Sequence, residues 1–415
     1  MGFILYPSNA MKNRCASLFL LAVLVLWVDG CRQSNTVISL EKDEIFTLSY
    51  GNFEDQLNVF DLAGISTIKI PITMRDGFFY VVNSKAKKIM QMNTYGDLIT
   101  FYYNPQVNPA PSYAKDKDVR VATRRAVEYD FNELSCVAVD SHKQLYVVDK
   151  LPLDRQEQDG QSRQVLNEVV LRFGSDGHFK DYIGQHGPGD VPFPSVKDIH
   201  TTNKDEFVVV SYASNGYTVF WFSADGYLLY KVPIDNQDMP SPYGEDSGKL
   251  WHTIDNIVPD YQSHRLYVKV DYYSSYIDEA SRLQSGVTFT NSYIYELDVE
   301  DGSFGEPLEV LPYTEQISEG FSNTRYEIPY DFLGVTENGW LFFLLSTTDG
   351  FAVQMIQRDG RRILKRNLAT DKRESLYYTF TLSNSGILSA LFVKEDKASV
   401  DWWRTDTLIQ SIVSN

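Results

Sequence analysis

A strand–turn–strand phrase recurs along this chain and limits the folds open to it. The phrase is clearest in VVLRFGSDGHFKDYIG at residues 169–184 and in TVFWFSADGYLLYKV at residues 218–232. Variants stand at residues 89–103, 294–311 and 353–366. A unit of two strands can bury only one face, so several copies must stack on one another to form a core. The repeat therefore predicts an all-β repeat architecture, and a β-propeller in particular.

The repeats divide into blades when they are phased by strand. Residues 134–150, LSCVAVDSHKQLYVVDK, give an inner strand, a polar turn and a second strand, and a later hairpin completes four strands. Four such units end at hairpins that contain Asp176-Gly177, Asp225-Gly226, Asp301-Gly302 and Asp359-Gly360. Residues 66–103 supply one more blade, and residues 377–411 supply a last one with a degenerate hairpin near Thr405. The sequence thus predicts six four-stranded antiparallel blades.

The segment before the first blade contains strand-like runs that have no blade of their own. Residues 44–62 include EIFTLSY and QLNVFDL. We expect an N-terminal strand to close the last blade, because an open ring would leave an unpaired sheet edge at the seam. Glycine in the hairpins supports the phasing, since a two-residue hairpin turn needs positive φ, which glycine reaches without steric cost. Residues 44–415 are therefore predicted to form a single propeller domain.

Composition is consistent with one large β domain that does not bind nucleic acid. The chain has 415 residues, of which 43% are hydrophobic and 14% aromatic, and closed β architectures often reach such a size as one unit. The formal net charge of -17 opposes long-range attraction to phosphate backbones and to anionic lipid. We expect a monomer that contacts the membrane only through an N-terminal lipid.

Residues 1–30 have the features of an export signal. Lys12 and Arg14 precede an apolar run at residues 16–28, which is shorter than a membrane-spanning helix requires. Met11 is the favoured start, because residues 1–10 carry no positive charge. The sequence VDGC at residues 28–31 resembles a bacterial lipobox, in which Cys31 becomes the lipidated N terminus. Asp29 departs from the small residue that is usual at its position. Residues 31–43 would be a tether, and the alternative is an ordinary secretory signal with an incidental cysteine.

A family resemblance covers about two of the blades. VAVD, LYVVD, VVLRFGSDGHF, YIGQHGPGDVPFPSVKDI and EFVVV follow in order between residues 136 and 210. This stretch is similar to successive NHL repeats of bacterial six-bladed propeller lipoproteins, of the kind found in spirochaetes. The resemblance implies a fold and a cell-envelope location, facing the periplasm or on the outer membrane, but no defined activity.

The long connections fall on one face of the predicted ring. They are the insertions at residues 150–167 and 271–291 within blades, and the connections at residues 104–130, 235–250 and 312–326 between blades. Long loops on a rigid scaffold often bind ligands, and tyrosine and arginine are common interface anchors. The candidate binding residues on this long-loop face are Tyr113, Arg120, Arg124, Arg125, Tyr129, Arg155, Arg163, Tyr272, Tyr273, Tyr276 and Arg282. A solvated, mobile surface is the alternative interpretation of any one of them.

Alignment of the inner strands predicts a polar ring near the mouth of the central channel. Its members are Lys69, Cys136, Asp198, Asn256, Asp331 and Thr379. Converging acids such as Asp198 and Asp331 could hold a cation, with calcium the chemical match for oxygen ligands, or could bind a basic group of a partner. A water-filled channel with ordinary polar lining is favoured over both, because a one-residue slip in register would move every member.

Motifs of known catalytic sites are mostly missing from the sequence. It contains no G-x-S-x-G, P-loop or Rossmann fingerprint. Cys136 could act as a nucleophile with His142 or His200 as its base, although a lone cysteine on a buried strand is more often a small hydrophobic residue. We therefore expect a binding or scaffold module that takes an envelope protein, peptide or glycan on the long-loop face. The alternative is a hydrolase or lyase with a metal-assisted site at the channel mouth.

Overall fold

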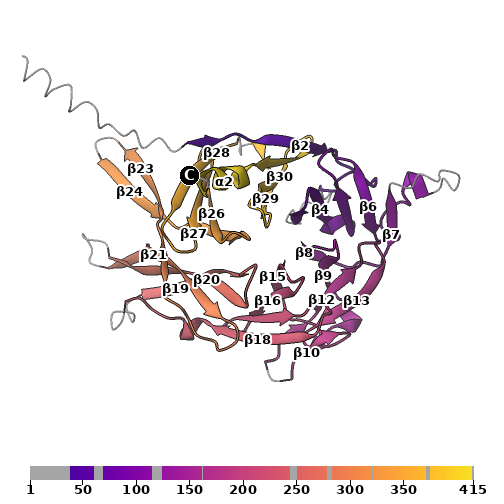
Figure 1. The fold of residues 1–415 in the computed structure, drawn as a ribbon, viewed down its shortest axis with the longest axis horizontal. Helices are drawn as coiled ribbons and strands as arrows, with labels where there is room; N and C mark the ends of the chain where they lie inside the picture. The colour runs from indigo at the N-terminus through magenta and orange to yellow at the C-terminus, as the bar shows by residue number, and fades with distance from the viewer. Residues whose placement is uncertain are drawn as a thin grey trace, which may run out of the picture. The chain divides into compact units, whose positions relative to one another are not determined.

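Six antiparallel sheets follow one another around a ring in the computed structural model (Figure 1). The structure describes residues 38–59, 69–114, 124–160, 162–243, 250–277, 283–319, 322–370 and 374–413. The predicted signal, Met11 and Cys31 lie outside these residues, as does most of the tether. Ser39–Asn415 forms one compact unit. The six-bladed, nearly all-β prediction is confirmed.

Each blade is a meander that runs from the central channel outward. The first three blades contain β3 (Ile72–Arg75), β4 (Phe78–Asn83), β5 (Lys88–Met92) and β6 (Leu98–Tyr103); β8 (Leu134–Val139), β9 (Leu145–Lys150), β12 (Glu168–Phe173) and β13 (Phe179–Gly184); and β15 (Val196–Thr201), β16 (Phe207–Ala213), β17 (Gly216–Phe222) and β18 (Leu228–Asp235). The last three contain β19 (Leu250–Pro259), β20 (Arg265–Ile277), β21 (Gln284–Asp298) and β22 (Leu308–Val310); β25 (Asp331–Val335), β26 (Trp340–Thr347), β27 (Gly350–Gln357) and β28 (Ile363–Ala369); and β29 (Tyr377–Leu382), β30 (Leu388–Val393), β31 (Ala398–Trp403) and the N-terminal β2 (Asp43–Leu48).

The ring closes through the N-terminal strand, as predicted. β2 pairs antiparallel with β31 and becomes the outermost strand of blade 6. A second short strand, β1 (Ser39–Leu40), pairs parallel with β28 of blade 5. Phe46 of β2 is 7% exposed, and its ring lies 5.6 Å from that of Phe79 in blade 1. The closing strand therefore joins blade 6 to blade 1 through packing as well as through backbone pairing.

Two local predictions at the sheet edges are wrong. The degenerate hairpin expected near Thr405 is instead the start of the α-helix α2 (Thr405–Val413), because β2 already supplies the fourth strand of blade 6. The hairpins are also not two-residue turns. Gly177 and Gly226 have positive φ while the preceding aspartates do not, and the register shifts beside each turn. This is the geometry of a three-residue loop with a glycine bulge.

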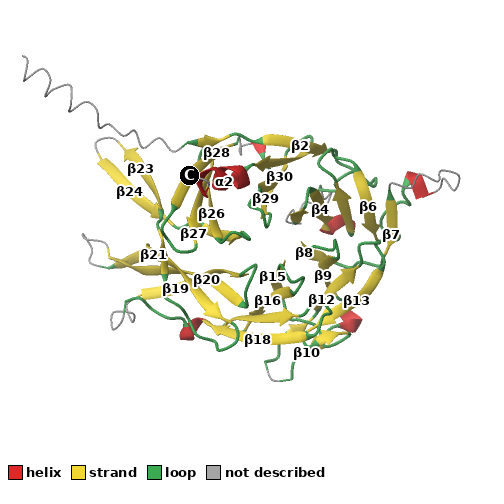
Figure 2. Cartoon of the chain, in the orientation of Figure 1, coloured by secondary structure: helices red, strands yellow, loops and turns green. Residues whose placement is uncertain are grey.

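Several predicted loops contain additional strands (Figure 2). The connection after blade 1 includes β7 (Arg125–Glu128), which pairs parallel with β6. The insertion in blade 2 contains the hairpin of β10 (Glu157–Gln158) and β11 (Val165–Leu166), and β14 (Gly187–Pro188) adds to β13. The connection before blade 5 is the hairpin of β23 (Tyr313–Glu319) and β24 (Ser322–Ile328). The loop expected at residues 271–291 is largely a continuation of the β20–β21 pair.

The core lies between the blades rather than within each sheet. Six clusters of buried hydrophobic side chains each join one blade to its neighbour, and the cluster that contains Phe46 joins the last blade to the first. Trp221, Trp340 and Trp403 are at most 1% exposed within these clusters. Because every cluster is shared between two blades, stability depends on an unbroken ring.

No helix in the described part of the chain is long and apolar enough to cross a membrane.

Candidate functional site

β-bulges near the start of the inner strands turn polar side chains toward the channel. The register of β15 shifts between Val196 and Asp198, and that of β19 shifts between Ile254 and Asn256. β25 has the same shift between Phe332 and Gly334. The structural counterpart of Asp198 in β25 is therefore Gly334, and the sequence alignment that paired Asp198 with Asp331 is displaced by three residues. Bulges of this kind cannot be located from an ungapped alignment.

The central channel forms a polar cavity of about 350 Å³. Four members of the predicted ring line it: Cys136, Asp198, Asn256 and Thr379. The other two lie beside it. Lys69 is an exposed residue before the first strand, and Asp331 is the exposed first residue of β25. The structure thus brings four of the six residues together, and it adds Arg75, Lys197, His200 and Tyr261 to the lining.

Tyr261 links three blades at one end of this channel. The residue follows β19 of blade 4, and its hydroxyl accepts hydrogen bonds from Arg75 Nη2 at 3.2 Å and from Asn384 Nδ2 at 2.7 Å. Arg75 belongs to blade 1, which lies opposite blade 4 in a ring of six. At the other end, the side chain of Asp198 is 43% exposed. We call this cavity the channel well, its Tyr261 end the closed end, and its Asp198 end, on the long-loop face, the mouth.

The nucleophile and base considered for the channel do not form an activated pair. Cys136 Sγ donates to the Lys197 carbonyl at 3.3 Å, and burial, with a smaller contribution from Asp198, raises the pKa of its thiol to about 12. The thiol is therefore protonated at neutral pH and is not a thiolate nucleophile. Burial lowers the pKa of His200, whose Nε2 lies 3.7 Å from Asp198 Oδ2. His142 lies in the turn after β8, at the closed end.

A buried ion cluster stands beside the mouth of the well. Lys269 of β20 is 0% exposed, and its Nζ lies 3.1 Å from Asp255 Oδ2 and 2.7 Å from Asp271 Oδ1. Asp255 also accepts the backbone N–H of Phe332 at 2.8 Å, which joins blade 4 to blade 5. Asp331 is exposed as a whole residue, but partial desolvation of its carboxyl, and next the charge of Asp255, raises its pKa. The predicted acid Asp331 is therefore an outer member of this ion cluster.

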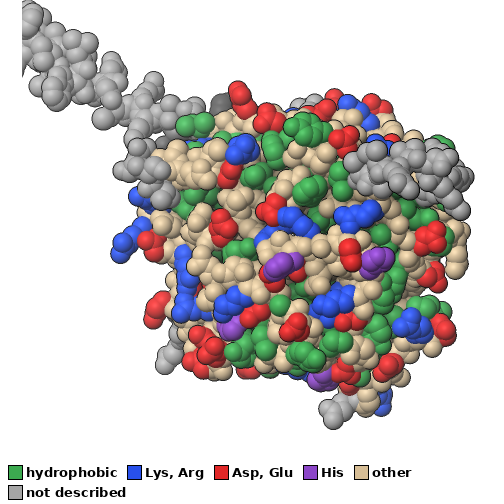
Figure 3. All heavy atoms as spheres, turned by 45° about the vertical axis from the view of Figure 1, so that its right-hand side comes forward, with side chains coloured by type: hydrophobic (Ala, Val, Ile, Leu, Met, Phe, Trp, Pro, Cys, Tyr) green, Lys and Arg blue, Asp and Glu red, His purple; other side chains and the backbone are tan. Residues whose placement is uncertain are grey.

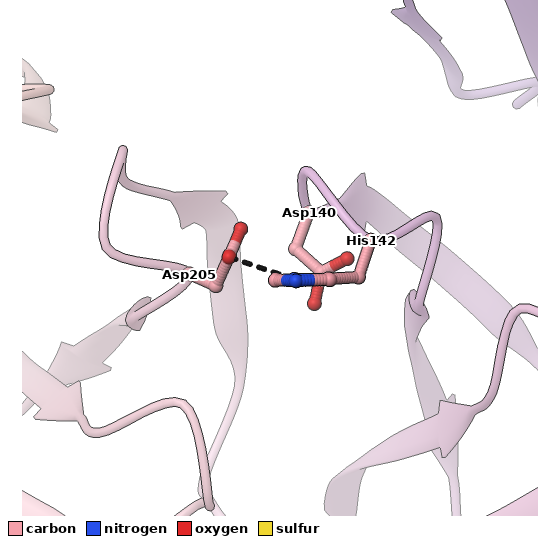
Figure 4. A group of neighbouring side chains, drawn as sticks. All are labelled: Asp140, His142 and Asp205. Carbon is pink, nitrogen blue, oxygen red and sulfur yellow. Dashed lines mark ion pairs between the residues drawn. The ribbon is translucent and has the colours of Figure 1, made fainter.

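Among the described residues, one group of His, Cys, Asp and Glu side chains is close enough to share a metal ion. It consists of Asp140, His142 and Asp205, whose potential ligand atoms lie within 4.8 Å of one another (Figure 4). His142 Nδ1 is 2.8 Å from Asp205 Oδ2, and Ser141 donates to both carboxylate oxygens of Asp205 through its N–H and Oγ. The group joins the inner turns of blades 2 and 3, and these bonds give it a structural role.

Similar contacts link other inner turns at the closed end. Lys143 pairs with Asp76 between blades 2 and 1. Asn203 N–H donates to the Tyr261 carbonyl at 3.0 Å between blades 3 and 4, and Glu337 N–H donates to the Asn384 carbonyl at 2.9 Å between blades 5 and 6. In the sequence, this arrangement is marked by a polar residue in each short turn. Polar residues are common in turns for local reasons, so they did not predict contacts between blades.

A groove on the long-loop face begins between blades 1 and 2 and continues along blade 2. Two adjoining cavities of about 550 and 420 Å³ share Leu151, Arg155 and Tyr182. Tyr129 lines the larger cavity, and its ring lies 4.9 Å from those of Phe131 and Phe179. Arg155 is exposed at the end of the short helix η4 (Leu153–Arg155). We call this surface the Arg155 groove. Two of the predicted loop-face residues, Tyr129 and Arg155, meet in it.

The remaining loop-face candidates are dispersed. Tyr272 is 2% exposed and donates to the Pro240 carbonyl at 2.7 Å, so its prediction as a surface anchor is wrong. Tyr113 is half-buried and donates to the Arg125 carbonyl at 3.0 Å. Arg125 donates to the Ser175 carbonyl at 2.8 Å. Arg124 and Arg163 are exposed, and Tyr273 packs on Phe289 at 5.9 Å. Arg120, Arg282 and the side chain of Tyr276 lie outside the described residues.

Charged side chains of both signs share the surface of the ring on the face shown in Figure 3. Acidic and basic groups are interspersed there, although the formal net charge of the chain is -17. Local charge therefore decides which ligand a given pocket can take, because exposed charges more than about 10 Å apart are largely screened by salt.

Asp149, which lines the Arg155 groove, should make stability depend on pH. Burial raises the pKa of its carboxyl from 3.8 to about 6, although the N–H groups of Asn132 and Glu133 donate to it. A raised folded-state pKa gives stability that is full below the unfolded pKa and is lost as the pH rises through the folded pKa. Between about pH 4 and pH 7 the protein should lose about 2 kcal/mol relative to Asp149→Asn. Urea unfolding of both proteins at each pH measures this difference, and parallel pH profiles would contradict it.

Comparisons with known proteins identify no family for this chain. No family model and no curated protein matches the sequence. Among solved structures, the polysaccharide lyase Uly1 has a TM-score of 0.42 at 6% identity, over 88% of this chain and 99% of that one. The Dos1 propeller has a TM-score of 0.39 at 10% identity, over 88% and 95%. Hydrazine synthase of Kuenenia stuttgartiensis has a TM-score of 0.39 at 10% identity, over 82% and 98%. Similarities at this level assign no activity to the chain.

Proposed function

We propose that this chain is a binding module of the bacterial cell envelope, held by a lipid on Cys31, whose long-loop face receives a partner. The partner is a segment of an envelope protein, a peptide or a glycan that lies in the Arg155 groove. The proposal is supported by the two unlike faces of the ring. Short turns linked to one another make up the closed face, whereas the opposite face carries the long connections, the well mouth and the groove.

The observation that carries the proposal is the meeting of Tyr129 and Arg155 in one groove. They come from different connections, one after blade 1 and the other within blade 2. A half-buried aromatic ring beside an exposed guanidinium is a common arrangement at binding hot spots. Among the described residues, no carboxylate forms an ion pair with Arg155, so its charge is open to an acidic or polar group of a partner.

Arg155→Ala should weaken partner binding by at least about tenfold, since hot-spot truncations remove more than about 1–2 kcal/mol. The assay captures partners from solubilised envelopes on the full-length chain and compares the yield with the native sequence. Arg163→Ala is the matched control, because Arg163 is also an exposed arginine of the blade 2 insertion but does not line the groove.

Two results would contradict the proposal. Equal capture by the native chain and Arg155→Ala would remove the groove from the binding surface. An unmodified Cys31, or cleavage elsewhere, in mass spectra of the same purified chain would contradict the lipid anchor while leaving the groove result intact.

A further inference from the structure

The closed end of the channel well contains a buried guanidinium with unused donors. Arg75 is 7% exposed, and its Nη2 donates to Tyr261. Its Nε and Nη1 are buried and have no hydrogen-bond acceptor in the part of the chain that the structure describes. Asp76 Oδ2 lies 3.8 Å from Nε, which is an ion-pair distance and not a hydrogen bond, and this carboxylate also pairs with Lys143. Buried charged donors without acceptors are unfavourable and point to a missing partner.

A second unpartnered group lines the same cavity. The Nε2 atom of His200 is buried without a hydrogen-bond partner among the described residues. His200 and Arg75 belong to blades 3 and 1, so two elements far apart in sequence present unused polar atoms to one space. Both side chains line the same cavity, and this coincidence distinguishes the well from an isolated surface arginine.

The local charge of the well favours a ligand with one negative charge. Of the charged residues that line it, Arg75 and Lys197 are positive and Asp198 is negative, which leaves one positive charge. His200 adds none at neutral pH, because burial lowers its pKa. A carboxylate matches this single charge, whereas a phosphate monoester carries about two negative charges at pH 7. Guanidinium donors bind carboxylates through strong charge-assisted hydrogen bonds.

The neutral lining favours a ligand that also carries hydroxyl groups. The cavity lining includes five threonine and asparagine residues: Thr73, Thr201, Thr381, Asn256 and Asn384. Hydroxyl and amide groups both donate and accept hydrogen bonds, so they suit a polyhydroxylated molecule better than a hydrocarbon chain. The cavity volume of about 350 Å³ is within the range of small-molecule sites.

We propose that the channel well is a binding site for a small hydroxylated carboxylate, a hydroxy acid or an acidic sugar, whose carboxylate is held by Arg75 at the closed end. The ligand enters from the long-loop face past Asp198 and Lys197. Tyr261 lies at the closed end and positions the guanidinium by accepting from Nη2. This site is separate from the Arg155 groove and does not depend on the function proposed for that groove.

Calorimetric titration with lactate and with glucuronate tests the proposal, with glycerol and glucose as the uncharged counterparts and inorganic phosphate as the dianion. At least one carboxylate should bind, its uncharged counterpart should not, and phosphate should bind more weakly. Arg75→Gln should weaken carboxylate binding by at least about tenfold, the scale of one lost charge-assisted bond. Arg361→Gln is the control, because Arg361 is 85% exposed on an outer hairpin.

Tyr261→Phe provides a second variant if Arg75→Gln does not fold. It preserves charge and ring volume and should weaken carboxylate binding by a smaller factor. Equal binding to the native chain and to either variant would overturn the proposal, as would a crystal grown with lactate in which only water contacts Arg75 Nε and Nη1. Arg155→Ala should leave carboxylate binding unchanged, so failure of the groove and failure of the well give different results.

Discussion

Phe46→Asp is expected to lower the free energy of unfolding by about 5 kcal/mol, because it places a charged side chain in the core at the seam of the ring. Phe46 is 7% exposed on the closing strand β2, and its ring meets Phe79 of blade 1 edge to face at 5.6 Å. The substitution removes this contact and buries a carboxylate among Leu48, Leu98 and Val400. Urea unfolding followed by tryptophan fluorescence measures the change.

Phe53→Asp is the matched control for this prediction. Phe53 is the same residue type in the same N-terminal segment, but it is 61% exposed. The control should change the free energy of unfolding by less than about 0.5 kcal/mol. Equal and small effects of both substitutions would show that the N-terminal strand is not needed to hold blade 6 against blade 1.

Glycine-bearing hairpins made most of the fold predictable from the sequence. Gly96, Gly177, Gly226, Gly302 and Gly360 all have positive φ at the outer hairpin of a blade, where the repeat phrase placed them. Closure by β2 was predictable because six inner repeats leave one strand to be supplied from elsewhere. The helix α2 was not predictable in the same way. The last repeat keeps its three inner strands, and the helix stands where its own fourth strand was expected, because β2 already fills that place.

The channel lining was less predictable, because it depends on bulges and on contacts across the ring. A bulge at Lys197 and another at Asp255 set which side chains face the axis. Neither lysine nor aspartate predicts a bulge from the sequence. The hydrogen bonds of Tyr261 depend on partners in blades 1 and 6, which are distant in sequence. Local patterns therefore predicted that the channel is polar, whereas the Tyr261 hydrogen bonds and the position of Arg75 beside them needed the three-dimensional arrangement.

Burial also separates residues that look alike in sequence. Tyr129 and Tyr272 both follow sheet strands in regions read as long loops. Tyr129 is half-buried at a groove, while Tyr272 is enclosed because β20 continues through it and Tyr295 Oη lies 3.0 Å from its hydroxyl. The continued pairing of β20 with β21 decides the difference, and strand length is not fixed by residue type alone. Hence one tyrosine is a candidate binding residue and the other is part of the core.

Lys269→Met is expected to lower the free energy of unfolding by about 3–5 kcal/mol, the range for removing one partner of a buried ion pair. Lys269 is 0% exposed and bridges Asp255 and Asp271. Methionine fills nearly the same volume, so the loss reports the uncompensated carboxylates rather than a cavity. Lys150→Met is the control, because the pair of Lys150 with Glu133 is largely exposed and should contribute less than about 1 kcal/mol.

The pH dependence of the Lys269→Met effect tests this electrostatic cause. Burial raises the pKa of Asp271, and Lys269 opposes that increase. Without the ammonium group the folded-state pKa of Asp271 rises further, so stability of the variant is retained at low pH and is lost as the pH rises through that pKa. The difference from the native protein should therefore grow from pH 4 to pH 8 in urea unfolding. A difference that is equal at both pH values would assign the loss to packing, and the ion cluster would then not be what joins blade 4 to blade 5 at the mouth of the well.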